Sequence, residues 1–286
     1  MPLPADPTAT AALDLWQATV LGFIQGMTEF IPISSSGHLR VVPELLGWGD
    51  PGEAFTAVIQ LGSLFAVFWY FRHDLLQLAR GSLAAVQKKE WANHDLRISL
   101  GIGLGTLPIC VVGLTIKLFF KAQYHQFRES LLAIGIASIA LALLLLLAEK
   151  LAKHERSFQQ TTFADSLAIG SAQVLALMPG VSRSGATITT SLFLGIKRSD
   201  AARFSFLLGL PAIAIAGAAE FKDVVEAGRQ FPPLSLAVAL LSSAVFSYLS
   251  IAWMVRYLQR HGMWIFIAYR LAFGALLIAW ACHHQG

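Results

Sequence analysis

Gln25-Gly26-Met27-Thr28-Glu29-Phe30-Ile31-Pro32-Ile33-Ser34-Ser35-Ser36-Gly37-His38 lies inside an otherwise apolar region, residues 15–46. On a helix, Gln25 and Glu29 are one turn apart and share a face. Pro32 ends that helix, and the serines after it are suited to cap the start of another. We therefore expect two short helices joined by a break, with a carboxylate, hydroxyls and an imidazole beside it.

A second break of the same kind lies in the apolar region 167–196, at Pro179-Gly180-Val181-Ser182-Arg183-Ser184-Gly185-Ala186-Thr187. Here the hydroxyls accompany a guanidinium. The two regions also share their spacing, because Gly22 and Gly37 are 15 residues apart, as are Gly170 and Gly185. This agreement in order and spacing indicates an internal repeat.

The composition is that of a membrane protein. Hydrophobic residues make up 56% of the 286 positions and charged residues 13%, which excludes a water-soluble surface. Six stretches approach or exceed the roughly 17 to 25 apolar residues that a membrane-spanning helix needs. They are Phe55–Phe71, Ile98–Leu118, Leu131–Ala148, Phe204–Ala219, Leu234–Val255 and Met263–Cys282.

We predict an all-α integral membrane protein with six spanning helices and two re-entrant helical hairpins. Each repeat has one hairpin and three spans, so the second copy is inverted relative to the first. The first repeat covers 1–149, with its hairpin at about 15–46, and the second covers 163–286, with its hairpin at about 167–196. Inverted repeats with broken helices that meet in mid-membrane and direct their N-termini at an anion are typical of transporters.

Basic residues predict the orientation, because cytoplasmic loops are rich in Lys and Arg. If the loop 72–97 is cytoplasmic, thirteen of the 21 Lys and Arg lie on that side: Arg72, Arg80, Lys88, Lys89, Arg97, Lys150, Lys153, Arg156, Lys197, Arg198, Arg203, Arg256 and Arg260. The opposite loops hold Lys117, Lys121, Arg128, Lys222 and Arg229. The net charge of +4 thus reflects topology, and nucleic acid is not an expected partner.

Phosphate is the ligand that suits both breaks. Arg183 can bind two phosphate oxygens at once, and the N–H groups at the helix starts can bind others. A bare Glu29 would repel a diphosphate. It fits if it holds a divalent cation, Mg²⁺ or Ca²⁺, or if it serves as a base that activates a hydroxyl or a water. This combination favours catalysis over simple binding.

At these residues the chain resembles the undecaprenyl-diphosphate phosphatases of the bacitracin-resistance (BacA) type. The resemblance rests on 25–38, 55–62 and 179–187 and extends to Tyr269-Arg270. It implies a bacterial inner-membrane enzyme that removes the terminal phosphate of undecaprenyl diphosphate at the outer face. That reaction recycles the carrier lipid of cell-wall synthesis and confers resistance to bacitracin. The resemblance also implies a divalent cation and a possible homodimer.

The resemblance implies roles for the residues that match the family pattern. Glu29 matches an acid that serves as base or metal ligand, Ser35 the favoured nucleophile, and His38 a residue assigned to proton transfer or to nucleophilic attack. Gln25 stands where some members have a second Glu, so Glu29 carries the acid role alone. We expect catalysis from Glu29, Ser35, His38 and Arg183, and substrate binding from Gln25, Ser34, Ser36, Ser182, Ser184 and Thr187.

Structural interpretations of the same residues are open. Gln25 and Gln173 could hydrogen-bond between helices, and Ser34 and Ser36 could be caps. His38 could be a hydrogen-bonded structural residue. Among the charged groups, Arg183 could serve only as the counter-ion of Glu29, and Arg270 could snorkel, form a structural pair or contact ligand.

Two other functions are open as well. Paired broken helices are also a transporter's design, so a flippase of the polyprenyl phosphate is the alternative. Ser36-Gly37-His38 imitates part of the motif of the phosphatidic-acid-type phosphatases, but the rest of their pattern is missing from the sequence.

Overall fold

The computed structural model describes residues 13–120, 123–124 and 130–284, whose regular elements are helical, as predicted. Residues 1–12 of the first predicted repeat, and Lys121 and Arg128, lie outside these ranges. In chain order the elements are α1 (Leu15–Phe30), α2 (Ser35–Leu45), α3 (Gly52–Tyr70), α4 (Arg72–Lys88), α5 (His94–Phe119), α7 (Leu131–Leu151), η1 (Phe158–Gln160), α8 (Phe163–Ala172), η2 (Gln173–Leu177), α9 (Arg183–Phe193), α10 (Arg198–Ala219), α11 (Phe221–Gln230), α12 (Pro233–Tyr257) and α13 (Trp264–His284).

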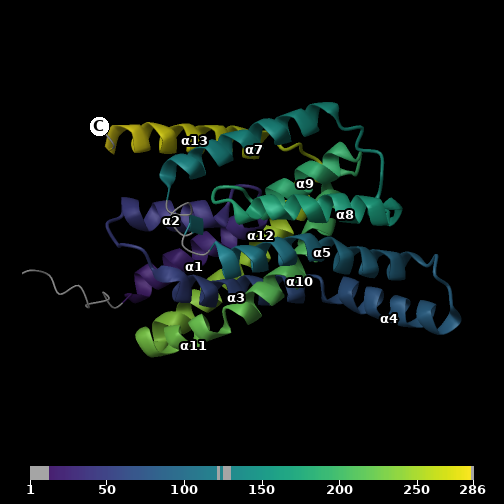
Figure 1. Cartoon of the computed structure of the whole chain (residues 1–286), viewed down its shortest axis with the longest axis horizontal. Helices are drawn as coiled ribbons and strands as arrows, with labels where there is room; N and C mark the ends of the chain where they lie inside the picture. Colours follow the sequence, from purple (N-terminus) through teal and green to yellow (C-terminus); the bar gives the residue numbers. More distant parts are fainter. Residues whose placement is uncertain (1–12, 121–122, 125–129, 285–286) are drawn as a thin grey trace, which may run out of the picture.

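Six helices in the described part of the chain are long and apolar enough to cross a membrane: α3, α5, α7, α10, α12 and α13. Each overlaps one of the apolar stretches expected to span, so the prediction of a six-span, all-α membrane protein is confirmed. In Figure 1, α4 lies at the right-hand end of the bundle and α11 at the left-hand end. The re-entrant placement of the two hairpins and the division into inverted repeats stay predictions.

The structure has two helices, α4 and α11, where the sequence pattern indicates loops. In α4 only Leu78 and Ala85 are buried, and its charged residues are mostly exposed. Such short amphipathic helices lack a long apolar run, so a search for spans passes over them. They lie at opposite ends of the bundle (Figure 1).

The first break lies between α1 and α2. Helix α1 ends at Phe30, and Ile31 is extended, with φ −71° and ψ 139°, as is usual before a proline. Ser34 has φ 79° and caps α2, because its Oγ accepts a hydrogen bond from the backbone N–H of Gly37 at 3.4 Å. The expected break and its serine cap are therefore both present.

The second break lies between η2 and α9. Helix α8 continues as the 3₁₀ helix η2, which ends at Leu177. Gly180 has φ 83°, and a Cβ on it would lie 2.5 Å from the carbonyl oxygen of Ile134 in α7, so this position needs glycine. Ser182 caps α9 by accepting from the backbone N–H of Gly185 at 3.1 Å.

Helix α12 packs closely against α1 of the first hairpin. A Cβ on Gly26 of α1 would lie 2.7 Å from the backbone of α12, so small residues let the two helices approach closely. The hydroxyls of α12 then bond to backbone carbonyls of α1: Ser242 to Thr19 at 2.8 Å and Ser250 to Met27 at 3.3 Å. These contacts hold α1 against a spanning helix.

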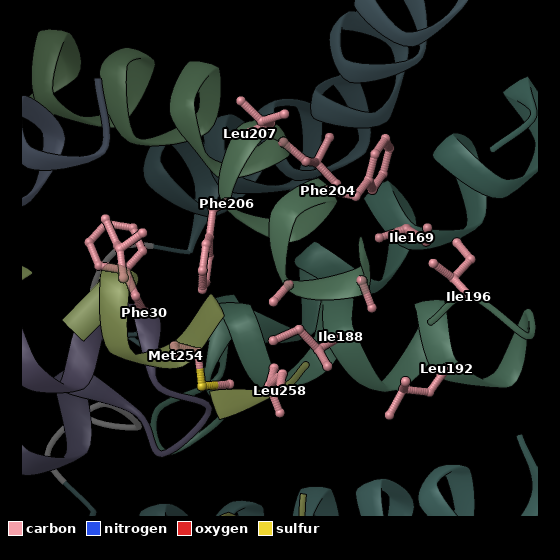
Figure 2. Packing of buried hydrophobic residues seen from close by; sticks show 14 of the residues in the cluster. Phe30, Ile169, Ile188, Leu192, Ile196, Phe204, Phe206, Leu207, Met254 and Leu258 are labelled. Carbon is pink, nitrogen blue, oxygen red and sulfur yellow. The ribbon is translucent and has the colours of Figure 1, made fainter. Parts of the chain in front are cut away.

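The largest apolar cluster fills one half of the bundle. It is built from the helix ends that adjoin the loops predicted to be cytoplasmic, and Phe30 reaches into it from the first break. The rings of Phe30 and Phe206 pack edge to face, 5.3 Å apart between centroids. Figure 2 shows this cluster, with side chains that include Ile188 and Leu192 of α9 and Met254 of α12.

Candidate active site

Arg270 of α13 joins the two breaks. Its guanidinium donates to the carbonyl oxygen of Pro32 at 3.1 Å and to that of Gly180 at 2.9 Å, while Nε donates to the carbonyl of Ser138 at 3.2 Å. The side chain is fully buried. The contacts of Arg270 are structural, but its partners are carbonyls that a broken helix leaves unpaired and not the acid of an ion pair.

Glu29 lies at the centre of the junction and accepts from three side chains. Its Oε1 accepts from Arg183 Nη2 at 2.9 Å, and its Oε2 accepts from Ser35 Oγ at 2.8 Å and from Gln25 Nε2 at 3.1 Å. Side chains from both breaks thus converge on one carboxylate. The acid of the first break and the guanidinium of the second therefore lie together in the folded chain.

Gln25 acts as a donor to the carboxylate. Its amide donates to Glu29 and, at 3.3 Å, to Ser63 Oγ of α3. The bond to Ser63 is the interhelical contact expected if Gln25 is structural. The bond to Glu29 gives a chemical reason for an amide at this position. A second carboxylate here would face Glu29 as a like charge, whereas an amide N–H stabilises it.

Arg183 lies against a glycine of α10. A Cβ on Gly209 would overlap the guanidinium at Nη1, so only a residue without a side chain leaves room for it. Nη1 is buried and has no hydrogen-bond partner among the described residues, while Nη2 bonds to Glu29. The exposed fractions of the Arg183 and Glu29 side chains are 14% and 8%. The pair neutralises two charges that are costly to bury singly.

A cavity of about 210 Å³ lies at this junction. Its apolar lining includes Ile109 in the second half of α5 and Ala212 and Ala216 near the end of α10. The cavity therefore lies in the half of the bundle opposite the apolar cluster and the loops predicted to be cytoplasmic. Its polar lining consists of Gln25, Glu29, Ser34, Ser35, Ser36, Thr56, Gln60, Ser182 and Arg183.

The expected substrate-binding hydroxyls divide into two groups. Ser34, Ser36 and Ser182 line the cavity, where Ser34 and Ser36 also bond to each other at 3.3 Å. Ser184 and Thr187 instead make structural bonds: Ser184 Oγ donates to the carbonyl of Ile31 at 3.3 Å, and Thr187 Oγ1 contacts Ser205 Oγ at 2.6 Å. The substrate-binding role of all these residues stays a prediction.

His38 uses both ring nitrogens within the protein. Nδ1 lies 2.7 Å from the carbonyl oxygen of Ser34, and Nε2 lies 2.6 Å from the hydroxyl of Tyr269. The ring is buried and stacks on Phe273, with centroids 4.4 Å apart. These are the contacts of the structural interpretation, and the expected catalytic role of His38 stays a prediction.

Several residues of the site were not singled out by sequence reasoning. Thr56 and Gln60 line the cavity from α3 and lie within the segment 55–62, which carries part of the family resemblance. Their spacing of one helical turn, on the span after the first break, was the available signal. Gly209 and Tyr269 act through contacts that only the folded chain reveals.

The donors around the cavity suit a hard divalent cation. Carboxylate, amide and hydroxyl oxygens are available, and Glu29 is the single acid in the lining. Among the described residues, His, Cys, Asp and Glu form no group of three or more that could hold a metal ion. One carboxylate completed by phosphate oxygens is the usual way in which Mg²⁺ binds with a phosphate substrate. The residues thus fit a cation that arrives with its substrate.

Comparisons with known proteins identify the family of this chain. The family model described as "Bacitracin resistance protein BacA" matches residues 18–276, which include both breaks and Ser36-Gly37-His38. A protein of Synechococcus elongatus named undecaprenyl-diphosphatase is 55% identical over 93% of this chain and 93% of its own length. Proteins of the same name from a Synechocystis species (54% identical, 93% of this chain, 82% of its own) and Parasynechococcus marenigrum (49%, 98% and 99%) are also similar. The chain therefore belongs to the bacitracin resistance protein BacA family.

Proposed function

We propose that this protein hydrolyses undecaprenyl diphosphate to undecaprenyl phosphate and inorganic phosphate. The observation that carries the proposal is the arrangement at Glu29, whose carboxylate accepts from Ser35 at 2.8 Å and from Arg183 at 2.9 Å beside one cavity. The Ser35 hydroxyl, the Glu29 carboxylate as its base and the Arg183 guanidinium as a phosphate-binding group thus lie next to one another. Its relatives are named undecaprenyl-diphosphatase, which points to the same substrate.

The size of the cavity supports a lipid substrate. At about 210 Å³ it is smaller than the roughly 300–1,000 Å³ of pockets that enclose whole small-molecule ligands. It suits a diphosphate head group whose isoprenoid chain stays outside, in the bilayer. Apolar side chains such as Ile109, Ile213 and Ala216 border the polar residues. The first isoprene units of the substrate would contact this apolar surface.

In the proposed reaction, Ser35 Oγ, or a water held beside it, attacks the terminal phosphorus while Glu29 accepts the proton. The bond from the terminal phosphorus to the bridging oxygen breaks, and undecaprenyl phosphate leaves. Glu29 passes the accepted proton to the departing phosphate oxygen and is a carboxylate again. If Ser35 is the nucleophile, water then attacks the phosphoserine while Glu29 takes its proton, and inorganic phosphate leaves as Ser35 Oγ receives that proton. Arg183 and Ser182 stabilise the charge on the phosphoryl oxygens. Gln25 holds the carboxylate in place.

Glu29 would hold a divalent cation, Mg²⁺ or Ca²⁺, together with oxygens of the diphosphate. Such a cation lowers the charge of the substrate and polarises the phosphoryl group. Because the lining offers a single acid, we expect the cation to bind with the substrate. Chelation by EDTA should therefore abolish phosphate release, and added Mg²⁺ or Ca²⁺ should restore it. Full activity in EDTA would contradict this part of the proposal.

We place the active site on the outer face of the bacterial inner membrane. The cavity lies near the start of α3 and the ends of α5 and α10, opposite the basic segments 72–97, which contains α4, and 152–162. The positive-inside rule assigns those segments to the cytoplasm. With Cys110 and Cys282 replaced by serine, single cysteines introduced at Gly49 or Arg80 in intact cells would test this, because a membrane-impermeant thiol reagent should label only the first.

The central test is phosphate release by the purified protein from undecaprenyl diphosphate in detergent micelles. We expect activity in the wild type and in Glu44→Gln, and nearly none in Glu29→Gln. A flippase, the alternative function, would release no phosphate where no second compartment exists, and an inactive wild type would overturn the proposal.

Light scattering of the same samples tests the homodimer that the family resemblance implies.

A further inference from the structure

His38 and Tyr269 form a hydrogen bond that the proposed reaction does not use. The two residues come from opposite ends of the chain, and His38 Nε2 lies 2.6 Å from the Tyr269 hydroxyl. The other ring nitrogen, Nδ1, lies 2.7 Å from the carbonyl oxygen of Ser34. His38 is 6% exposed, so both nitrogens need partners within the protein.

These two contacts determine where the imidazole carries its proton. A carbonyl oxygen can only accept, so His38 Nδ1 must be the donor to Ser34. In the neutral ring Nε2 then holds a lone pair, and the hydroxyl of Tyr269 donates to it. Tyr269 therefore favours the tautomer that keeps the bond to Ser34, because the second nitrogen of a histidine sets the role of the first.

The carbonyl that His38 holds belongs to a strained residue. Ser34 has φ 79° and ψ 98°, a conformation that residues other than glycine rarely adopt. Such a conformation persists only where surrounding contacts maintain it. The Ser34 carbonyl also accepts from the backbone N–H of His38, but at 3.3 Å, so the imidazole makes the shorter bond.

The same carbonyl lies in the peptide plane that leads to Ser35. Because a peptide unit is planar, fixing its oxygen also fixes the direction in which Ser35 leaves the turn. Ser35 Oγ is 2.8 Å from Glu29 Oε2. A chain of direct contacts therefore connects Tyr269, through His38 and Ser34, to the pair that the proposed reaction uses.

We propose that Tyr269 and His38 are positioning residues: Tyr269 holds His38 in the tautomer that fixes the Ser34 turn, which directs Ser35 at Glu29. This inference rests on the proposed function, in which Ser35 and Glu29 react with the diphosphate. It assigns no role to Tyr269 as a ligand, and it makes the N–H of His38, not its basicity, the feature that activity requires.

Two substitutions of His38 separate positioning from catalysis. The amide of Asn can take the place of the Nδ1 donor, whereas Leu has no donor, and neither can act as base or nucleophile. We expect His38→Leu to lower kcat about 100-fold and His38→Asn to retain at least about a tenth of the wild-type kcat, with little change in KM. If His38→Asn is folded and as inactive as His38→Leu, the proposal is wrong.

Tyr269→Phe removes only the hydroxyl. We expect it to lower kcat about tenfold in the presence of His38 and to have no further effect in the His38→Asn background, which has no Nε2 to hold. Tyr248→Phe, on α12, is the matched control. Wild-type kcat in Tyr269→Phe, or an equal loss on both backgrounds, would show that Tyr269 does not act through the imidazole.

The wild-type arm of the same assay separates this inference from the proposed function. An inactive wild type contradicts both. An active wild type with an inactive but folded His38→Asn contradicts only the positioning role, because phosphate release itself is then established. Size-exclusion profiles and thermal unfolding in detergent verify that each variant is folded.

Discussion

The two breaks have similar sequences but different backbones. Ser34 and Ser182 each cap the helix after the break through the N–H three residues on. Ser182 does so in a relaxed conformation, with φ −73° and ψ 128°, whereas Ser34 has φ 79° and ψ 98°. In the second break the positive φ occurs instead at Gly180, where it costs little.

This difference separates two tasks. The first break places a strained serine directly before Ser35, whose Oγ is 2.8 Å from Glu29 Oε2, so its geometry serves the hydroxyl and its base. The second break supplies a guanidinium on a regular helix start, and its glycine serves close packing on α7. We infer that the first break is specialised for proton transfer and the second for binding charge.

Glu29→Gln should have the largest effect, because it removes the base and leaves Arg183 without its counter-ion. We expect kcat for phosphate release to fall by about 10³-fold. Gln25→Ala removes one donor to the same carboxylate and should lower kcat by only about 3- to 10-fold. Comparable losses in both variants would show that the first break works through its hydrogen bonds and not through its base.

Arg183→Lys tests the second break while keeping its charge. An ammonium cannot bind two oxygens in the fork of a guanidinium. We expect kcat/KM to fall about 100-fold, with a substantial part of the loss in KM. The measurement is a full saturation curve with the lipid diphosphate. An unchanged KM together with a reduced kcat would mean that the second break also takes part in the chemical step.

Gly209→Ala should displace the Arg183 guanidinium, since a methyl group there would overlap Nη1. We expect about a tenfold loss of kcat/KM, smaller than that of Arg183→Lys because the guanidinium remains present. Gly217→Ala, on the same helix, is the control: its Cβ would be 3.4 Å from the nearest side-chain atom, Leu61 Cδ2. Equal activity in the two alanine variants would contradict the packing argument.

The smallest effect should be the one that tests the strain itself. Glycine accepts the backbone of Ser34, so Ser34→Gly should leave thermal stability unchanged or raise it by up to about 1 kcal/mol. Ser182→Gly loses a cap at a relaxed position and should lower stability by about 0.5 kcal/mol. Thermal unfolding in detergent gives both values. A decrease of equal size in both variants would remove the distinction between the two breaks.

Much of this architecture follows from the sequence. The six spans coincide with its apolar stretches, and Pro32 and Pro179 mark breaks that the structure shows. The pairing of Glu29 with Arg183 was among the interpretations that the sequence left open, because two buried charges of opposite sign in hydrocarbon stabilise each other. The helices α4 and α11 were missed, since their mixed composition resembles that of a loop.

The functional details depend on contacts between distant segments. Arg270 could be read as a snorkelling residue, yet it holds the carbonyls of Pro32 and Gly180. Ser184 and Thr187 belong to the same motif as Arg183, but they make structural bonds while Arg183 lines the cavity. Nothing in the local pattern of Gly209 or Tyr269 indicates which side chain each one meets.

The sequence by itself determined that this chain lies in a membrane, where it breaks, and that Glu29 and Arg183 lie within its apolar segments. Lipid imposes those features on each segment separately, because every segment must satisfy its own backbone and exclude unpaired charge. Only the tertiary structure decided which nitrogen of His38 carries a proton, which glycine admits the guanidinium and which end of the bundle is hollow. These depend on the rotation and depth at which helices from opposite ends of the chain pack together, and local sequence does not specify either.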